Sequence, residues 1–223
     1  MRQGEVAVYE FRDPSERANA AVIAVLVWLA ADLAYTMGGF LMIAALGGLG
    51  GLGGIAGPAP GTADAVAGMG AIALLVAMVV SIVFVSRWIM RVNANAHAMS
   101  NAMTITPGWN VGWFFVPVAN LWKPFEGLRE TWRVSTSPND PLSVPTPGIM
   151  RWWWGLWLVT NILGNISTRV SFNSASRDAV VAGAWIDVVS FALDIGLAWA
   201  LIQVIRQLTA LQQHGPDYAE TFA

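Results

Sequence analysis

The sequence predicts an all-α protein of the polytopic membrane class, a helical bundle with about four spanning helices. Of its 223 residues, 56% are hydrophobic and only 12% are charged, a balance too apolar for an ordinary soluble domain. Four runs, at about 18–46, 65–86, 149–168 and 179–206, are nearly free of charge. Each is long enough to cross about 30 Å of hydrocarbon as a helix. A Trp-rich segment with an amphipathic helix lies between the second and third runs.

The composition argues against several functional classes. Cysteine is absent, which removes disulfides, thiolate zinc sites and cysteine nucleophiles. Only two histidines exist, so we expect no metal and no cofactor. The net charge is −2 and the twelve Lys and Arg residues are scattered, so we expect no nucleic-acid partner. We also expect no enzyme, although a carboxylate pair acting as acid and base is a third alternative.

The first 17 residues carry charges of both signs and lack the basic start of a secretory signal, so we expect a retained cytoplasmic head. Asp13, Pro14 and Glu16 have the spacing of a helix start, with Asp13 as the cap and Pro14 at the first helical position. The first span should begin here. Asp32 is the only charged residue in 18–46.

The segment 47–63 is rich in glycine and is predicted to be an external loop. Its glycine- and proline-rich part, 47–60, lacks the Lys and the Ser or Thr that complete a phosphate-binding loop. The second span, 65–86, ends at Arg87, Trp88 and Arg91, an aromatic and basic pattern typical of the cytoplasmic interface.

The segment 107–134 is predicted to lie at the membrane surface or to re-enter the membrane without crossing it. Its apolar part, 107–122, is short for a span and is broken by Pro117. An amphipathic helix completes the segment, and a Pro-rich cytoplasmic linker follows at 135–148. After the last two spans, residues 211–223 are expected to form a cytoplasmic tail.

The distribution of basic residues favours four spans with both termini in the cytoplasm. If 107–122 does not cross, ten of the twelve Lys and Arg residues lie inside and only Arg169 and Arg177 lie outside. If it crosses, the division becomes seven against five. We therefore expect a multi-pass protein of the bacterial inner, cytoplasmic, membrane.

The Trp-rich segment also carries a family signature. Its residues are Thr106, Pro107, Gly108, Trp109, Val111, Gly112, Trp113, Phe114, Phe115, Pro117, Asn120, Leu121, Trp122, Lys123, Pro124 and Phe125, then Arg129, Glu130, Trp132, Arg133 and Ser135. This run resembles the signature of the bacterial membrane proteins catalogued as domain of unknown function 4328. With flanking residues, the resemblance covers roughly 18–210. It implies a multi-span membrane protein and transfers no activity, substrate or catalytic residue.

Acidic residues inside the predicted spans are the main functional clue. An Asp at the centre of a spanning helix costs about 2.5–3.5 kcal/mol, so the two in the last span nearly cancel its apolar gain of about 4–8 kcal/mol. These carboxylates should therefore face other helices or water. Asp187, Ser190 and Asp194 share one helical face. The expected intramembrane polar site comprises Asp32, Tyr35, Asn161, Asn165, Asp187, Ser190 and Asp194.

Two interpretations of these polar residues stay open. They form an ion or proton pathway or a small polar binding site, or they are hydrogen-bonded structural links between helices. A second candidate surface, for contact with lipid or a partner, comprises Trp109, Trp113, Trp122, Lys123, Arg129, Trp132 and Arg133.

We expect an integral membrane protein of unknown specific function that serves as an association or lipid-linked scaffolding module. The alternative is a small ion- or proton-linked transporter or channel that uses the intramembrane aspartates. The expected partners are the lipid bilayer, including anionic lipids, and another membrane protein or a second copy of the chain.

Overall fold

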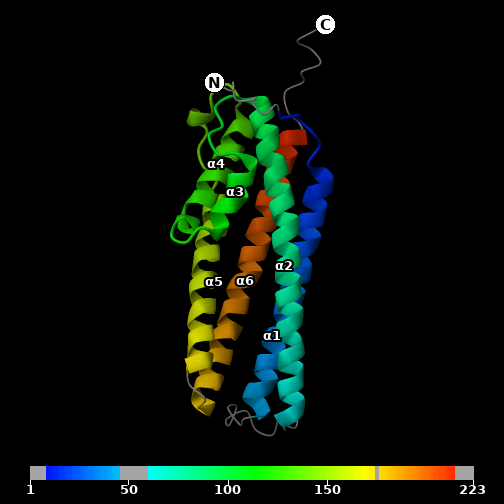
Figure 1. The fold of residues 1–223 in the computed structure, drawn as a ribbon, viewed down its shortest axis with the longest axis vertical. Coiled ribbons are helices and arrows are strands. Elements are labelled where there is room, and N and C mark those ends of the chain that lie inside the picture. The colour runs from blue at the N-terminus through cyan, green and yellow to red at the C-terminus, as the bar shows by residue number, and fades with distance from the viewer. Residues whose placement is uncertain (1–8, 46–59, 174–175, 214–223) are drawn as a thin grey trace, which may run out of the picture. The chain divides into compact units, whose positions relative to one another are not determined.

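In a computed structural model, the described residues are 9–45, 60–173 and 176–213, and they form helices and connecting segments without a strand. The elements are α1 (Ser15–Ala45), α2 (Pro60–Met99), α3 (Pro107–Gly112), η1 (Trp113–Phe115), η2 (Ala119–Leu121), α4 (Lys123–Thr136), η3 (Pro141–Ser143), α5 (Gly148–Asn173) and α6 (Arg177–Gln213) (Figure 1). The predicted all-α class is confirmed for this part of the chain.

The chain divides into two compact units. Unit 1 consists of Met1–Val22, Val83–Arg151 and Ile202–Ala223, and unit 2 consists of Ile23–Ile82 and Trp152–Leu201. The long helices α1, α2 and α6 contribute to both units. Unit 1 also holds the short helices and α4, whereas unit 2 is built from long helices only.

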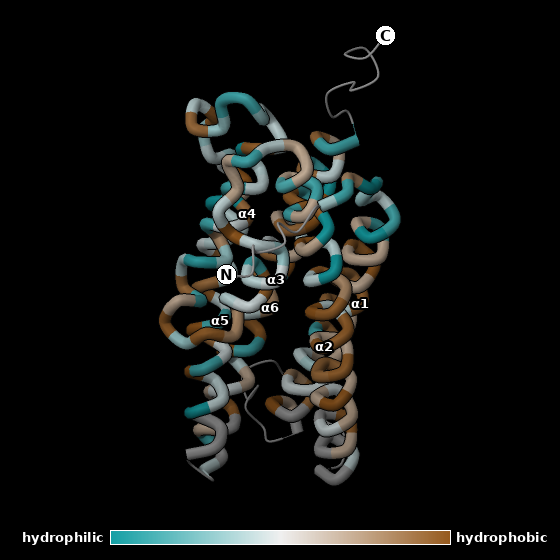
Figure 2. Tube along the Cα trace, turned by 45° about the horizontal axis from the view of Figure 1, so that its top comes forward, coloured by the Kyte–Doolittle hydropathy of each residue, from teal (hydrophilic) through white to brown (hydrophobic). Residues whose placement is uncertain are grey.

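Within the described ranges, three helices are long and apolar enough to cross a membrane, at Ser15–Leu41, Gly68–Met99 and Val181–Gln213. In unit 2 their large apolar side chains point outward, as with Ile72, which is 66% exposed, whereas polar Asp32 is only 8% exposed. Such an arrangement suits a lipid environment and indicates a membrane protein. The hydrophobic colouring along α1 and α2 in Figure 2 follows these apolar runs.

The fourth predicted span, 149–168, lies within α5, which is 26 residues long. α5 is not among the helices apolar enough to cross by themselves in the described chain. The helix is therefore present as expected, and its crossing of the membrane stays a prediction.

Helix boundaries differ from the predicted spans at several ends. Residues 60–63, expected in the Gly-rich loop, are helical because α2 begins at Pro60, a residue that a first helical turn accepts. The rest of that loop up to residue 59 lies outside the described residues, as does the tail from residue 214. At the start of α1, the backbone N–H of Ser15 donates to Asp13 Oδ1 at 2.9 Å, which confirms the predicted cap.

The segment 107–134 is not one continuous helix. Pro117 cannot donate a backbone hydrogen bond, and the chain turns at Val118 with φ 68° and ψ −52°. The Ala119 N–H donates to the Pro117 carbonyl at 2.8 Å, which closes a strained γ-turn. α4 then forms the predicted amphipathic helix. The position of this segment in or on the membrane stays a prediction.

Candidate functional site: an acidic cluster in unit 2

Three carboxyl side chains gather inside unit 2. Asp32 comes from α1, and Asp187 and Asp194 come from α6, where a spacing of seven residues places them on one face about 10 Å apart. Asp32 is close enough for the charges of both other carboxylates to act on it, that of Asp194 more strongly. The structure therefore brings together all three acidic residues of the predicted site.

Asp187 is held by two hydroxyl donors from other helices. The Tyr35 hydroxyl of α1 donates to Asp187 Oδ2 at 3.2 Å, and the Ser167 hydroxyl of α5 donates to Oδ1 at 2.6 Å. Both carboxyl oxygens thus have a partner, and the contacts join α1, α5 and α6. This is the geometry of a structural link between helices.

Asp32 is in a different situation. It is buried, and its Oδ2 has no hydrogen-bond partner among the described residues. The hydroxyls of Thr36 and Ser190 are also buried without a partner in this part of the chain. A buried acceptor without a donor costs free energy, so it calls for a proton, a cation or a water molecule.

Asp194 lies near Asp32, close enough for its charge to act on the Asp32 carboxyl group. The Thr160 hydroxyl of α5 donates to the Trp157 carbonyl of its own helix at 3.4 Å and lies close enough to Asp194 to interact with that carboxyl group. None of the three carboxylates forms an ion pair with a described basic residue, because the ion pairs there join Arg12 to Glu10 and Lys123 to Glu126. The described residues also contain no cluster of three His, Cys, Asp or Glu side chains that could hold a metal ion.

The two asparagines of the predicted site lie elsewhere. Asn161 and Asn165 are exposed, and their amides donate to backbone carbonyls one turn back in α5, those of Trp157 and Asn161, each at 2.7 Å. The α5 residues that face the carboxylates are Thr160 and Ser167 instead. Their spacing of seven matches the spacing of Asp194 and Asp187 on α6. This shared spacing is the pattern by which the sequence could have predicted Thr160 and Ser167.

The predicted lipid or partner surface in unit 1 is only partly exposed. Trp109 and Trp122 are exposed and Trp113 is half-buried, but Trp132 is buried. Of the basic side chains there, Lys123 pairs with Glu126 at 2.8 Å, Arg129 lies over the Phe125 ring, and Arg133 Nε donates to the Val144 carbonyl at 3.1 Å. These basic groups are thus engaged within the protein.

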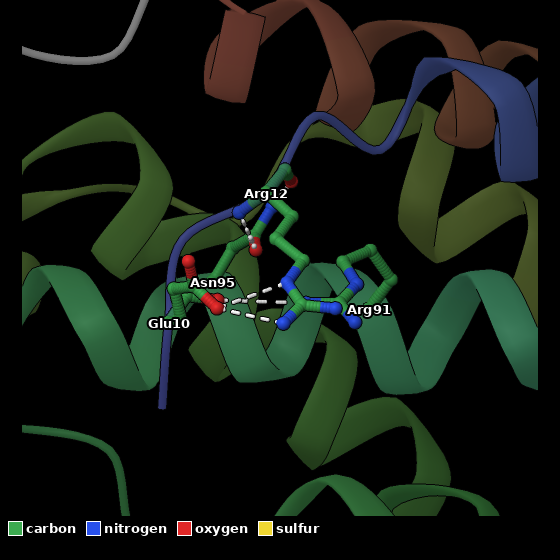
Figure 3. A network of polar contacts seen from close by, with 4 residues as sticks. All are labelled: Glu10, Arg12, Arg91 and Asn95. Carbon is green, nitrogen blue, oxygen red and sulfur yellow. Dashed lines mark hydrogen bonds and ion pairs between the residues drawn. The ribbon is translucent and has the colours of Figure 1, made fainter. Parts of the chain in front are cut away.

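Unit 1 also contains a buried polar network that sequence reasoning missed. Asn95 binds the backbone of Arg12 in both directions: its Oδ1 accepts from the Arg12 N–H at 3.1 Å, and its Nδ2 donates to the Arg12 carbonyl at 2.8 Å (Figure 3). Asn95 Nδ2 also donates to Gln212 Oε1, and Gln212 Nε2 donates to the Val92 carbonyl and to Ser135. These contacts fix the segment before α1 against α2 and α6.

The fold and the acidic cluster define the class as a helical membrane protein with carboxylates inside its apolar part. The chain belongs to the family described as Domain of unknown function (DUF4328), whose pattern matches residues 58–210. The predicted family is thereby confirmed. No curated protein and no solved structure matches the chain.

Proposed function

We propose that this membrane protein binds a proton or a small monovalent cation between Asp32 and Asp194 and moves it as an ion- or proton-linked transporter. The observation that carries the proposal is the buried Asp32 Oδ2, which lacks a donor and lies near a second carboxylate. A proton or cation shared by these two groups supplies the missing interaction.

The proposal assigns different tasks to the three carboxylates. Asp187 is saturated by Tyr35 and Ser167, so it serves as a structural link. Asp32 and Asp194 form the binding pair, because Asp32 Oδ2 has no donor among the described residues and the Thr160 hydroxyl near Asp194 donates to the Trp157 carbonyl. The structural-link and ion-pathway interpretations thus apply to different residues of the same cluster.

The test is proton and cation flux into liposomes that contain the purified protein. The variants Asp32→Asn and Asp194→Asn should each lose at least about tenfold in flux, since neither can exchange a proton or balance a cation. Asp178→Asn is the matched control, because Asp178 is an exposed acid at the start of α6. Flux that is equal in Asp32→Asn and the control, or absent from the original protein, would defeat the proposal.

A second candidate function is association with lipid or a partner through the Trp-rich segment. It is supported by large apolar side chains displayed around the strained turn, with Phe115 68% exposed and Val118 66% exposed. Such a surface suits a lipid-linked scaffolding module. Phe115→Ser with Val118→Ser should reduce the lipid or protein that co-purifies, whereas Leu142→Ser, at another exposed apolar site, should not.

The proposed topology has four crossings with both termini in the cytoplasm of a bacterial cell. It is supported by unit 1, which contains both ends of the described chain. Because the chain has no cysteine, single cysteines at Glu16 and Gln213 report the sides directly. Both should resist a membrane-impermeant maleimide in intact spheroplasts and react after lysis. Labelling of only one of them before lysis would contradict four crossings.

A further inference from the structure

Four arginines of unit 1 gather around the start of α1. Arg12 precedes α1, Arg17 lies in its first turns, and Arg87 and Arg91 lie one turn apart on α2. Arg17 Nη1 donates to the Arg87 carbonyl at 3.3 Å. The positive charges of Arg17 and Arg12 both act on Arg91. Like charges therefore accumulate here at an electrostatic cost.

The acidic groups nearby do not neutralise this cluster. The Glu10 carboxylate accepts from Arg12 Nε at 3.1 Å and Nη2 at 2.7 Å, and these contacts hold the pKa of Glu10 below its usual value. Arg91 reaches the Glu10 backbone carbonyl at 3.5 Å, as Figure 3 shows, rather than a second carboxylate. Asp13 accepts from Ser15 at the helix start.

The remaining acid near α1, Glu16, is exposed and forms no ion pair within the described chain. Arg17, Arg87 and Arg91 likewise have no ion pair among the described residues. Three guanidinium groups thus form no ion pair in this part of the protein, and the nearest carboxylate to Arg91, that of Glu10, is already paired with Arg12.

The depth of the cluster matches a lipid headgroup. Residues 68–86 of α2 carry no charge and, at about 1.5 Å per residue, extend over about 28 Å, close to the hydrocarbon thickness. Most of their large apolar side chains are exposed up to this end, with Val83 at 46%. Arg87 follows this uncharged stretch directly, so we expect it at the level of the lipid phosphates. Figure 2 shows the hydrophobic colouring of α2 fading toward this end.

The side chains of Arg17 and Arg91 are already held in place by contacts within the protein. Arg17 and Arg91 each use one guanidinium contact on a backbone carbonyl, which orients the side chain and leaves its other donors free. The segment before α1 is itself fixed, because Asn95 binds the Arg12 backbone. A planar guanidinium held in this way suits bidentate recognition of phosphate oxygens.

We infer that Arg17, Arg87 and Arg91 form a binding site for the phosphate of an anionic lipid headgroup. The site is separate from Lys123, Arg129 and Arg133, whose side chains are engaged elsewhere in unit 1. A lipid is favoured over a soluble phosphate because exposed apolar side chains of α2 adjoin the site and provide contact for acyl chains.

The test measures the thermal unfolding midpoint, Tm, of the protein in neutral detergent with added phosphatidylglycerol or phosphatidylcholine. Phosphatidylglycerol should raise the Tm by about 5 °C or more at saturation, and phosphatidylcholine should not. The triple variant Arg17→Gln, Arg87→Gln, Arg91→Gln should lose this rise. The control Arg151→Gln with Arg206→Gln, at two other exposed arginines of unit 1, should keep it.

Three results would overturn the inference: an undiminished rise in the triple variant, an equal loss in the control, or a full rise with inorganic phosphate alone, which would assign the site to a soluble anion. If the triple variant is unfolded in phosphatidylcholine, the single variant Arg87→Gln decides the question. The Arg87 side chain is exposed and makes no hydrogen bond among the described contacts, so the fold should tolerate its loss. The single variant must still show a smaller increase in Tm with phosphatidylglycerol than the original protein.

Discussion

Gly127 offers a sharp test of how α3 and α4 pack in unit 1. Asn110 of α3 is fully buried against it, and a Cβ at position 127 would lie 2.8 Å from Asn110 Cγ and closer still to Oδ1. Real side chains do not approach so closely, so Gly127→Ala must displace the buried Asn110 amide or push α3 away from α4. The variant should be destabilised even though alanine favours a helix interior over glycine by about 1 kcal/mol.

The size of the effect follows from two opposing terms. Overpacking costs about 1–3 kcal/mol. At the upper end of that range, the cost exceeds the gain of about 1 kcal/mol in helix propensity. Neither polar atom of the Asn110 amide has a hydrogen-bond partner among the described residues, so Asn110→Ala removes an unsatisfied group as well as the clash. The double variant should regain about 1–3 kcal/mol relative to the sum of the two single variants.

The assay is a double-mutant cycle on the Tm in detergent, where each kcal/mol corresponds to about 2–4 °C for a chain of this size. Gly155→Ala is the matched control, because no atom lies within 4 Å of the Cβ it would add in α5. It should raise the Tm. If Gly127→Ala raises the Tm as much as the control, or if the single variants are additive, the packing argument is wrong.

Substitutions at three further positions, each with a defined hydrogen bond, test contacts on which the fold depends. The Ser15 hydroxyl and N–H lower the pKa of Asp13, so its contribution to stability is present above about pH 4 and is lost as the pH falls through the lowered pKa. In Tm measurements at pH 7, Asp13→Ala should therefore lower the free energy of unfolding by about 0.5–2 kcal/mol. This difference should become smaller at pH 3. Asp13→Asn keeps a capping side chain that does not titrate. Trp88→Phe should cost about 1–3 kcal/mol, because it removes the buried 3.1 Å hydrogen bond from Nε1 to Thr209; an unchanged Tm would contradict that contact. Ser167→Ala should cost a similar amount by removing a donor to Asp187, whereas the exposed Thr168→Ala should cost little.

Local patterns in the sequence predicted the helices well because long apolar runs and caps are local signals. The acidic stripe on α6 was also predictable, since Asp187, Ser190 and Asp194 recur on one helical face. The choice of Asn161 and Asn165 on α5 failed for a physical reason: one helix does not reveal which of its faces meets a neighbour. The polar pair on the facing side was available only through a comparison of two helices.

Other parts of the fold had no sequence signal that a single chain could provide. Asn110 and Gly127 meet across η1, a γ-turn and η2, and their approach depends on the path of that irregular segment. Asn95 and Gln212 are far apart along the chain and each looks like an ordinary surface residue of a helix end. Nothing local distinguishes them from solvent-exposed amides.

Where α5 packs against α6, it places a hydroxyl side chain near each of two positions in the acidic cluster, that of Asp187 and that of Asp194. On α5, Ser167 donates to Asp187 and Thr160 lies near Asp194, with the same spacing of seven residues as the two carboxylates have on α6. The difference comes from α1, which offers the Tyr35 hydroxyl to Asp187 but a second carboxyl, Asp32, near Asp194.

Asp187 therefore has a hydroxyl donor from each of two neighbouring helices, α1 and α5, whereas Asp32 and Asp194 bring two acceptors together. Asp32→Asn would supply the missing donor, so this variant should raise the Tm while it abolishes flux. Residues whose replacement stabilises a protein and removes its activity are typical of functional sites rather than structural links. If Asp32→Asn instead lowers the Tm as Ser167→Ala does, Asp32 is a structural link as well, and the ion-binding role loses its basis.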